Sequence, residues 1–168
     1  MWKRSHRADQ EARVIADRHY NRQKIGAPQF VPPGRCMVLK RDGCFWVTSF
    51  PFACYVKHEW AGAWVCTAFR RERGPLASEL IKEAVALTVQ YHLDRPNWNV
   101  DPLPHLGMIT FIDEKKVREK ADFGYCYRKA GFVVAGRTKS DDLLALRLPL
   151  STALRLWSEQ LEPRWKVR

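Results

Sequence analysis

The chain has no long apolar run and few acidic residues. No apolar stretch approaches the ~20 residues that a membrane-spanning helix needs, and Met1–Arg4 carries charge with no apolar segment behind it. A secretory signal requires such a segment. We therefore expect no membrane association and a cytoplasmic location.

Closely spaced cysteine pairs are also missing. The five cysteines are an odd number and none forms a Cys-x-x-Cys pair, which argues against a disulfide framework and against a structural zinc site. We expect reduced, mostly buried thiols. The chain also lacks internal repeats, low-complexity tracts and linkers, so residues 1–168 are predicted to form one domain. The cysteines are Cys36, Cys44, Cys54, Cys66 and Cys126.

The shortage of acidic residues leaves a large positive charge. Lysine and arginine number 29 against 18 acidic residues, giving a net charge of +11. An apolar content of 46% and an aromatic content of 12% favour a compact globule over a disordered tail. The positive charge favours a polyanionic partner, nucleic acid first and the phosphates of a coenzyme second. Charge that serves solubility alone is the alternative.

Hydrophobic periodicity and turn residues predict the order of elements. The order is a helix, a hairpin with an Asp42-Gly43 turn, a strand, a long helix, a strand, a short helix, two strands and a final helix capped by Ser151. This indicates a mixed sheet flanked by helices, in the α/β (α+β) class. The expected helices are 5–20, 76–92, 124–130 and 151–159, with a basic helical turn at 115–121, and the expected strands are 36–40, 45–49, 63–69, 106–112, 133–138 and 143–148.

The segment from Tyr127 to Phe132, with Gly131 before the phenylalanine, follows a helical run and precedes an apolar strand. Together with the element order from residue 8 to about 150, it resembles the GCN5-related N-acetyltransferase (GNAT) fold. The resemblance implies two parallel central strands that splay around an acyl-coenzyme A, with Tyr127 beside the thioester. The C-terminal helix and basic tail, 151–168, lie outside this core.

The same resemblance implies that the loop at 69–77 binds the coenzyme's pyrophosphate. Free N–H groups and the dipole at a helix start attract anions. The family's glycine pattern is not intact here, and Pro75 removes a donor. Acetyl-CoA or another acyl-CoA would therefore bind differently, weakly or not at all, and a plain solvated connection is the alternative. The implied cofactor-binding residues are Arg70, Arg71, Arg73, Gly74 and Ser78.

The dipeptide His19-Tyr20 closes the first predicted helix, with His19 on its apolar stripe. An inward histidine is more often a core residue than a ligand or base. The dipeptide, together with Asp113 and Tyr127, nevertheless resembles the phage Mom family of DNA-modifying proteins. That family converts adenine in phage DNA to N6-carbamoylmethyladenine and so blocks restriction, in the host cytoplasm.

The Mom resemblance implies that His19, Tyr20, Asp113 and Tyr127 are catalytic and hold iron, a metal that suits imidazole, carboxylate and phenolate ligands. Adjacent helical residues point about 100° apart, so the first two could share an ion only if the helix ends between them. A metal-free reaction would use His19 or Asp113 as general base and Tyr127 as proton donor. Tyr125 competes with Tyr127 for that role.

Basic residues on both sides of the predicted site would contact DNA, double-stranded or locally unpaired. Most aromatic residues between the hairpin and the central strand are expected in the core, with His58 and Trp60 the best candidates to line a groove. The predicted DNA-binding residues are Arg18, Arg22, Lys24, Lys115, Lys116, Arg118, Arg128 and Lys129.

Three functions stay open, because one fold hosts many. The first is a Mom-type DNA-modifying transferase, which the charge and the altered loop favour. The second is an acetyl-CoA-dependent N-acyltransferase on a small amine or a protein. The third is a non-catalytic nucleic-acid-binding protein of the same fold. A homodimer is compatible with each.

Overall fold

Alternating apolar residues and tight turns build one mixed β-sheet. The computed structural model describes residues 1–50, 58–95, 103–117 and 122–161. Within them the strands form a single sheet in the order β1-β2-β3-β4-β5-β7-β6, which confirms a mixed α+β domain. The strands are β1 Lys3–Ser5, β2 Cys36–Arg41, β3 Cys44–Ser49, β4 Trp64–Arg71, β5 Met108–Ile112, β6 Val133–Arg137 and β7 Leu144–Leu148.

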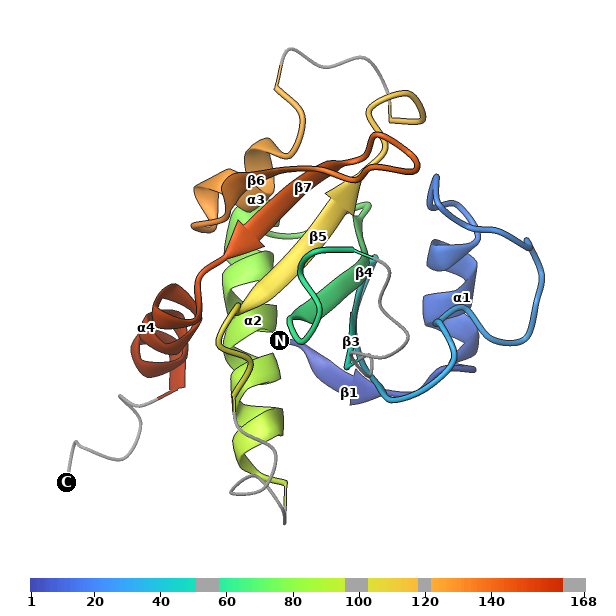
Figure 1. Cartoon of the computed structure of the whole chain (residues 1–168). Coiled ribbons are helices and arrows are strands. Elements are labelled where there is room, and N and C mark those ends of the chain that lie inside the picture. The colour runs from blue at the N-terminus through green and yellow to red at the C-terminus, as the bar shows by residue number, and fades with distance from the viewer. Residues whose placement is uncertain (51–57, 96–102, 118–121, 162–168) are drawn as a thin grey trace, which may run out of the picture.

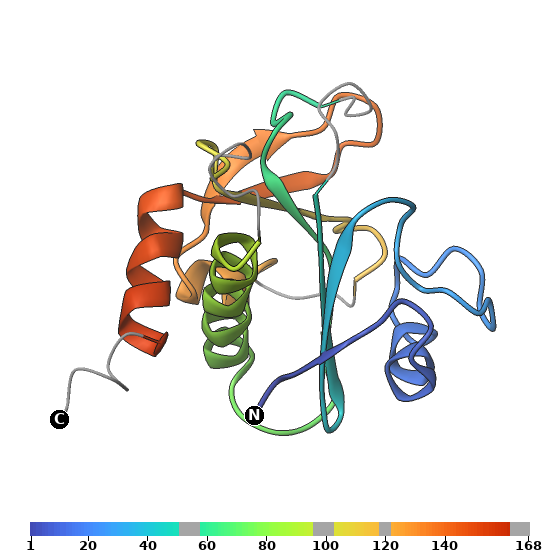
Figure 2. The same ribbon diagram turned by 90° about the horizontal axis from the view of Figure 1, so that it is seen from below.

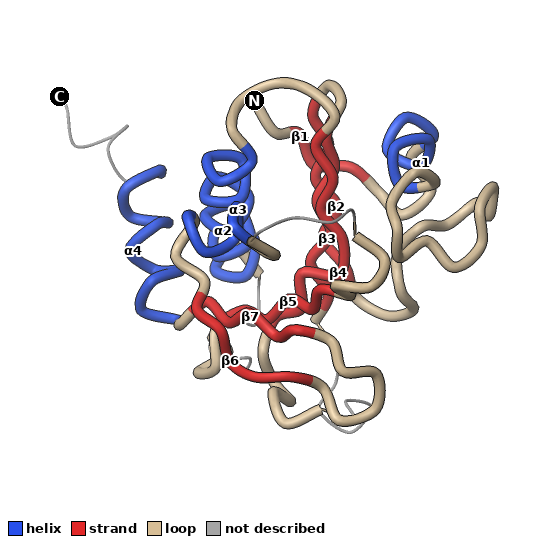
Figure 3. The backbone as a smooth tube through the Cα atoms, turned by 90° about the horizontal axis from the view of Figure 1, so that it is seen from above, coloured by secondary structure: helices blue, strands red, loops and turns tan. Residues whose placement is uncertain are grey.

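Helices cover both faces of this sheet (Figure 1). The helix α1, Gln10–Ala16, lies on one face, and α2, Ala77–Leu93, packs on the other with α4, Leu150–Leu161, and the short α3, Tyr125–Lys129. Figures 2 and 3 show α1 separated from the other helices by the sheet. No helix in the described part of the chain is long and apolar enough to cross a membrane.

The main core lies between the sheet and α2. Trp46 and Trp64 are almost fully buried there and meet the apolar stripe of α2, while Phe45 and Phe30 belong to a smaller cluster beneath α1. The expectation that most of the aromatic residues belong to the core is confirmed for the described ones. Trp60 is only 7% exposed, packed with His58 and Phe111, so its ring does not line an open groove.

The first helix differs most from prediction. It begins at Gln10, not at residue 5, because Lys3–Ser5 pairs with β2 as an edge strand. Asp9 caps it by accepting a hydrogen bond from the Ala12 amide at 2.9 Å. The helix ends at Ala16, so the expectation that His19 lies on a helical face is wrong.

The remaining elements agree with the expected order. The hairpin, the long helix and the parallel central strand are confirmed within two residues of the predicted ends. The final helix begins at Leu150, so Ser151 lies inside its first turn and does not cap it. Residues 115–117 form a turn and not a helix, and the rest of the predicted helical turn, like Cys54, lies outside the described residues.

Candidate active site

The central strands β4 and β5 run parallel and then separate. They pair only from Trp64 to Cys66 on β4, although β4 continues to Arg71. At the same point the register of β4 with β3 shifts, leaving Thr67 as an extra residue. A bulge bends and twists its strand. The bulge therefore accounts for a fork between the two strands, and the predicted splay is present.

Tyr127 reaches into this fork from α3. Its hydroxyl lies 3.7 Å from the Cys66 Sγ, and its ring packs edge-on against Phe69 and Phe132. On the neighbouring strand the Thr110 hydroxyl donates to the Cys66 carbonyl at 3.1 Å. A phenol, a thiol and a second hydroxyl thus meet where the strands part.

Two glycines set the position of Tyr127. Gly124, just before α3, has φ +72° and lies so close to Leu146 and Ile112 that a Cβ there would be 2.5 Å from the Leu146 Cδ1. Gly131, just after α3, has φ +105°, a conformation that suits glycine at a helix end. The Tyr-to-Gly-Phe spacing therefore holds one helical turn tightly against the sheet.

Tyr20 and Asp113 meet at the same fork. Burial raises the pKa of Tyr20, and a hydrogen bond from the Asp113 backbone partly offsets this rise. The charge of the Asp113 carboxylate also raises the pKa of Tyr20, although no side-chain hydrogen bond joins the two: one carboxylate oxygen accepts from the Lys115 amide at 3.1 Å and the other lies 3.4 Å from the Lys116 Nζ. The contact that joins these predicted partners is therefore through the backbone.

His19 lies beside Tyr20, with the two rings stacked 4.6 Å apart. Its Nε2 is 3.1 Å from the Phe69 carbonyl, and its Nδ1 accepts from the Asn21 amide at 3.3 Å. The Asn21 side chain donates to the Thr67 carbonyl at 2.9 Å. Two alternate carbonyls of β4, on the edge that β5 leaves free, are thus bound by the segment that follows α1.

Burial keeps the fork uncharged. It raises the pKa of Tyr127 well above its ordinary value and that of Cys66 to about 12. It also lowers the pKa of His19. The phenol and the thiol therefore stay protonated at neutral pH, and the imidazole is neutral.

The geometry does not fit an iron ion shared by His19, Tyr20, Asp113 and Tyr127. Both imidazole nitrogens already face backbone groups, and both phenols lie where the neutral form is favoured. The described residues contain no group of three or more His, Cys, Asp or Glu side chains that could hold a metal. We assign no step to iron, which stays a prediction from the Mom resemblance.

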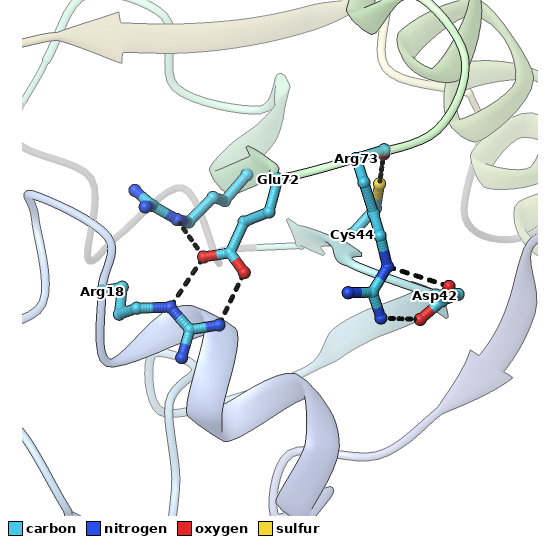
Figure 4. A network of polar contacts seen from close by, with 6 residues as sticks. Arg18, Asp42, Cys44, Glu72 and Arg73 are labelled. Atoms are coloured by element: carbon cyan, nitrogen blue, oxygen red, sulfur yellow. Dashed lines mark hydrogen bonds and ion pairs between the residues drawn. The ribbon is translucent and has the colours of Figure 1, made fainter.

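The end of β4 and the loop that follows it carry the arginines expected to bind a coenzyme. Glu72 accepts from Arg18 at 2.6 and 2.7 Å and from Arg70 at 2.9 Å. Figure 4 shows this network beside the pair of Arg73 with Asp42. The Arg71 guanidinium donates to the carbonyls of Gly74 and Pro75. All three arginines, Arg70, Arg71 and Arg73, are thus paired within the chain.

The backbone of this loop offers a conventional helix start. Gly74 has φ +94°, and Ser78 lies in the first turn of α2, whose N-cap position, Leu76, makes no side-chain capping bond. The expected phosphate cradle is therefore reduced to backbone amides beside internally paired charges. Bound phosphate would have to compete with carboxylates for Arg70 and Arg73 and with backbone carbonyls for Arg71.

The predicted DNA-binding residues divide into two groups. Arg22 is structural, because its guanidinium bonds Asp17 and the carbonyls of Ala27 and Gln29 with only 10% of the side chain exposed. Arg128 pairs with Asp122. The exposed cations are Lys24, Lys115, Lys116 and Lys129, together with Arg18 and Arg128 in their pairs with Glu72 and Asp122, whereas Arg118 lies outside the described residues.

Sequence reasoning missed three members of the fork, namely Cys66, Thr110 and Asn21. The first two are polar residues inside otherwise apolar strands, a signal that pointed to the core but not to each other. Asn21 directly follows the His19-Tyr20 pair, and nothing in its local sequence indicates that its side chain bonds β4. A search of family models, of curated proteins and of solved structures found no match to this chain.

Proposed function

We propose that this protein is a group-transfer enzyme that modifies an exocyclic amine of a base in DNA. The observation that carries the proposal is the neutral Tyr127 hydroxyl, 3.7 Å from Cys66 at the fork of two parallel strands. Two parallel central strands that separate are a feature that the GNAT resemblance implies, and their presence here supports the proposal. The Mom resemblance makes N6 of adenine the expected amine and a carbamoylmethyl group the expected addition.

Tyr127 has the properties of a proton donor. A protonated, desolvated phenol can give its proton to a leaving group as the bond from the transferred carbon to that group breaks. The new bond forms between the amine nitrogen and the transferred carbon. The amine then loses a proton, which restores the phenol through solvent.

The partner is inferred from charge. A net charge of +11 with lysines exposed on the segment after α1, after β5 and on α3 supports binding to a phosphate backbone. An amine paired inside a duplex cannot be reached until its base is extruded or unpaired. We therefore expect DNA, double-stranded or locally unpaired, as the substrate.

Nucleoside mass spectrometry tests the reaction. Plasmid DNA from cells that express the chain should contain deoxyadenosine of increased mass, and DNA from cells that express Tyr127→Phe should contain far less. Unmodified DNA in the presence of folded, expressed protein would contradict the proposal. A mass increase on another nucleoside would keep the reaction class and overturn the choice of adenine.

Salt dependence tests the DNA partner separately. Because binding to phosphates releases counterions, the affinity for duplex DNA should fall steeply as salt rises from about 50 to 200 mM. Fluorescence anisotropy with a labelled duplex measures this. A flat dependence would favour the acyl-CoA-dependent N-acyltransferase, although the paired arginines beside α2 speak against that alternative.

A further inference from the structure

The two edges of the sheet differ in how they are protected. β1, at one edge, is three residues long, and two of them, Lys3 and Arg4, are exposed cations. A short strand and charged side chains are common ways of keeping an edge from pairing with another chain. β6, at the opposite edge, is five residues long and carries three exposed apolar residues in succession, Val133, Val134 and Ala135. The β6 edge therefore lacks the protection that the β1 edge has.

The apolar surface of β6 is open on both faces of the sheet. Val133 lies opposite Arg147 of β7 and Val134 opposite Leu146, so the two valines point to opposite faces. They are 50% and 58% exposed, so neither face of the strand is covered. The other exposed large apolar residues in the described part of the chain are Met1, Val14, Ile25, Leu76 and Tyr125. These lie singly on separate segments, whereas a run of exposed apolar residues along a strand edge indicates a contact surface.

The outer side of β6 offers backbone groups for pairing. β7 pairs along one side of β6, and no strand in the described part of the chain pairs along the other. Figure 3 shows β6 at the outer end of the row of strands. An added strand would bond the outward N–H and C=O groups, as in β-augmentation. A bulge leaves Ala135 out of the ladder with β7, so the regular segments of β6 lie on either side of that residue.

Charges at the two ends of β6 point to the partner. Lys129, at the end of α3, and Asp141, in the turn after β6, are both exposed and lie equally far along the chain before and after Ala135. Neither forms an ion pair with a described residue: the Lys129 Nζ lies 5.4 Å from the centre of the Tyr125 ring, and Asp141 accepts from the Ser140 hydroxyl at 2.8 Å. An antiparallel strand of the same sequence, centred on Ala135, would bring the lysine end of each copy to the aspartate end of the other. A parallel strand would place like charges together, which is unfavourable.

We propose that β6 pairs antiparallel with β6 of a second copy of this chain, giving a twofold dimer with one continuous sheet. In such an interface each contact occurs twice, with the roles of the copies exchanged, and the lysine and aspartate ends satisfy this condition. At an ionic strength of about 0.15 M, the net charge of +11 on each copy is screened beyond about 8 Å, which limits the repulsion between copies. This inference does not rest on the proposed function.

A charged substitution on the edge tests the surface. Sedimentation equilibrium of the full chain, without DNA, should show a wild-type dimer. Val134→Lys should raise its Kd at least about tenfold, because a lysine on an edge strand opposes pairing. Val14→Lys adds the same charge at a 50% exposed position on α1 and should leave the Kd unchanged. Equal thermal melting of the two variants shows that both fold. A monomeric wild-type protein, assembly beyond the dimer, or an equal Kd in the two variants would overturn the proposal.

An exchange of charges tests the antiparallel arrangement. Lys129→Glu and Asp141→Lys should each weaken the dimer about fivefold, because each replaces two exposed ion pairs by like-charge pairs. An equimolar mixture of the two variants should recover the wild-type affinity, since each glutamate then meets a lysine and each remaining Lys129 meets an aspartate. Lys24→Glu, at an exposed position on the loop after α1, controls for net charge and should leave the Kd unchanged. A mixture that associates no more tightly than the separate variants would overturn the antiparallel pairing.

Discussion

Strand β4 passes through two regions of opposite electrostatic character. At the fork, Cys66 and the facing Tyr127 are neutral and desolvated. A few residues later, the strand's end and the following loop are dense in charge, and each arginine there is matched by a carboxylate or by carbonyl groups. One part of β4 thus lies in a neutral, desolvated environment, and the other part lies in an ion-paired one.

The difference teaches how to interpret basic residues in this chain. Arg70, Arg71 and Arg73 stand out in the sequence because they precede a helix. Each of their guanidinium groups is nevertheless paired with a carboxylate or with backbone carbonyls of the same chain. The uncharged groups at the fork attract less attention, yet they are the ones with unusual proton affinities. Strongly shifted pKa values are a pointer to function, whereas ion-paired surface charge is not.

The strongest test of the comparison removes one oxygen from the fork. We expect Tyr127→Phe to reduce DNA modification at least about 100-fold, as loss of a general acid does, with a change in unfolding free energy of no more than about 1 kcal/mol. Nucleoside mass spectrometry and chemical denaturation measure the two effects. Tyr125→Phe is the matched control, because that ring is 54% exposed and two residues away.

A second test asks how His19 acts. If the imidazole serves mainly to bond the Phe69 carbonyl and support the Tyr20 ring, His19→Ala should lower activity about tenfold, a loss equivalent to about 1.4 kcal/mol. His19→Gln, which can still donate to that carbonyl, should recover part of it.

The alternative for His19 predicts another pattern. If His19 were a general base or a metal ligand, both variants would lose activity to the same extent. The acidic limb of the pH–rate profile would also disappear in both. Equal loss in His19→Ala and His19→Gln would therefore restore the catalytic assignment made from the sequence.

The sequence predicts the elements of the fold well, because the signals are local. The Asp42-Gly43 turn, the stripe of α2 and the apolar run of β5 can each be recognised within a short window of residues. The three-residue strand β1 was missed because it is defined by pairing with Val38–Lys40, more than thirty residues away. That pairing also shortens the first helix.

The candidate site was predictable only in part, for the same reason. Tyr127 follows from its spacing to Gly131, a local pattern. The state of Arg73 depends on Asp42, on another strand, and the engagement of His19 depends on a carbonyl fifty residues away. Such contacts between distant segments decide whether a polar side chain is available, and a single sequence does not display them.

The smallest expected effect comes from the charged loop. The Arg18 guanidinium, with help from Arg70, lowers the pKa of Glu72 from an ordinary value of 4.5 to about 2. A carboxyl whose pKa is depressed in the folded protein contributes stability above its unfolded pKa and loses it as the pH falls toward the folded value. Glu72→Gln should therefore reduce the unfolding free energy at neutral pH.

The size and pH range of that loss distinguish the loop from the fork. Arg18 is 47% exposed, so solvent screening limits the loss to about 1 kcal/mol or less. The difference between wild type and Glu72→Gln should be constant above about pH 5 and vanish between pH 4.5 and about 2, with DNA modification unchanged at neutral pH. Urea denaturation across this range, with the exposed Glu59→Gln as control, measures it. A difference that persists at pH 2 would mean that the charge of Glu72 is not its cause. A loss of modification in this variant would mean that the loop takes part in the reaction and that the contrast with the fork does not hold.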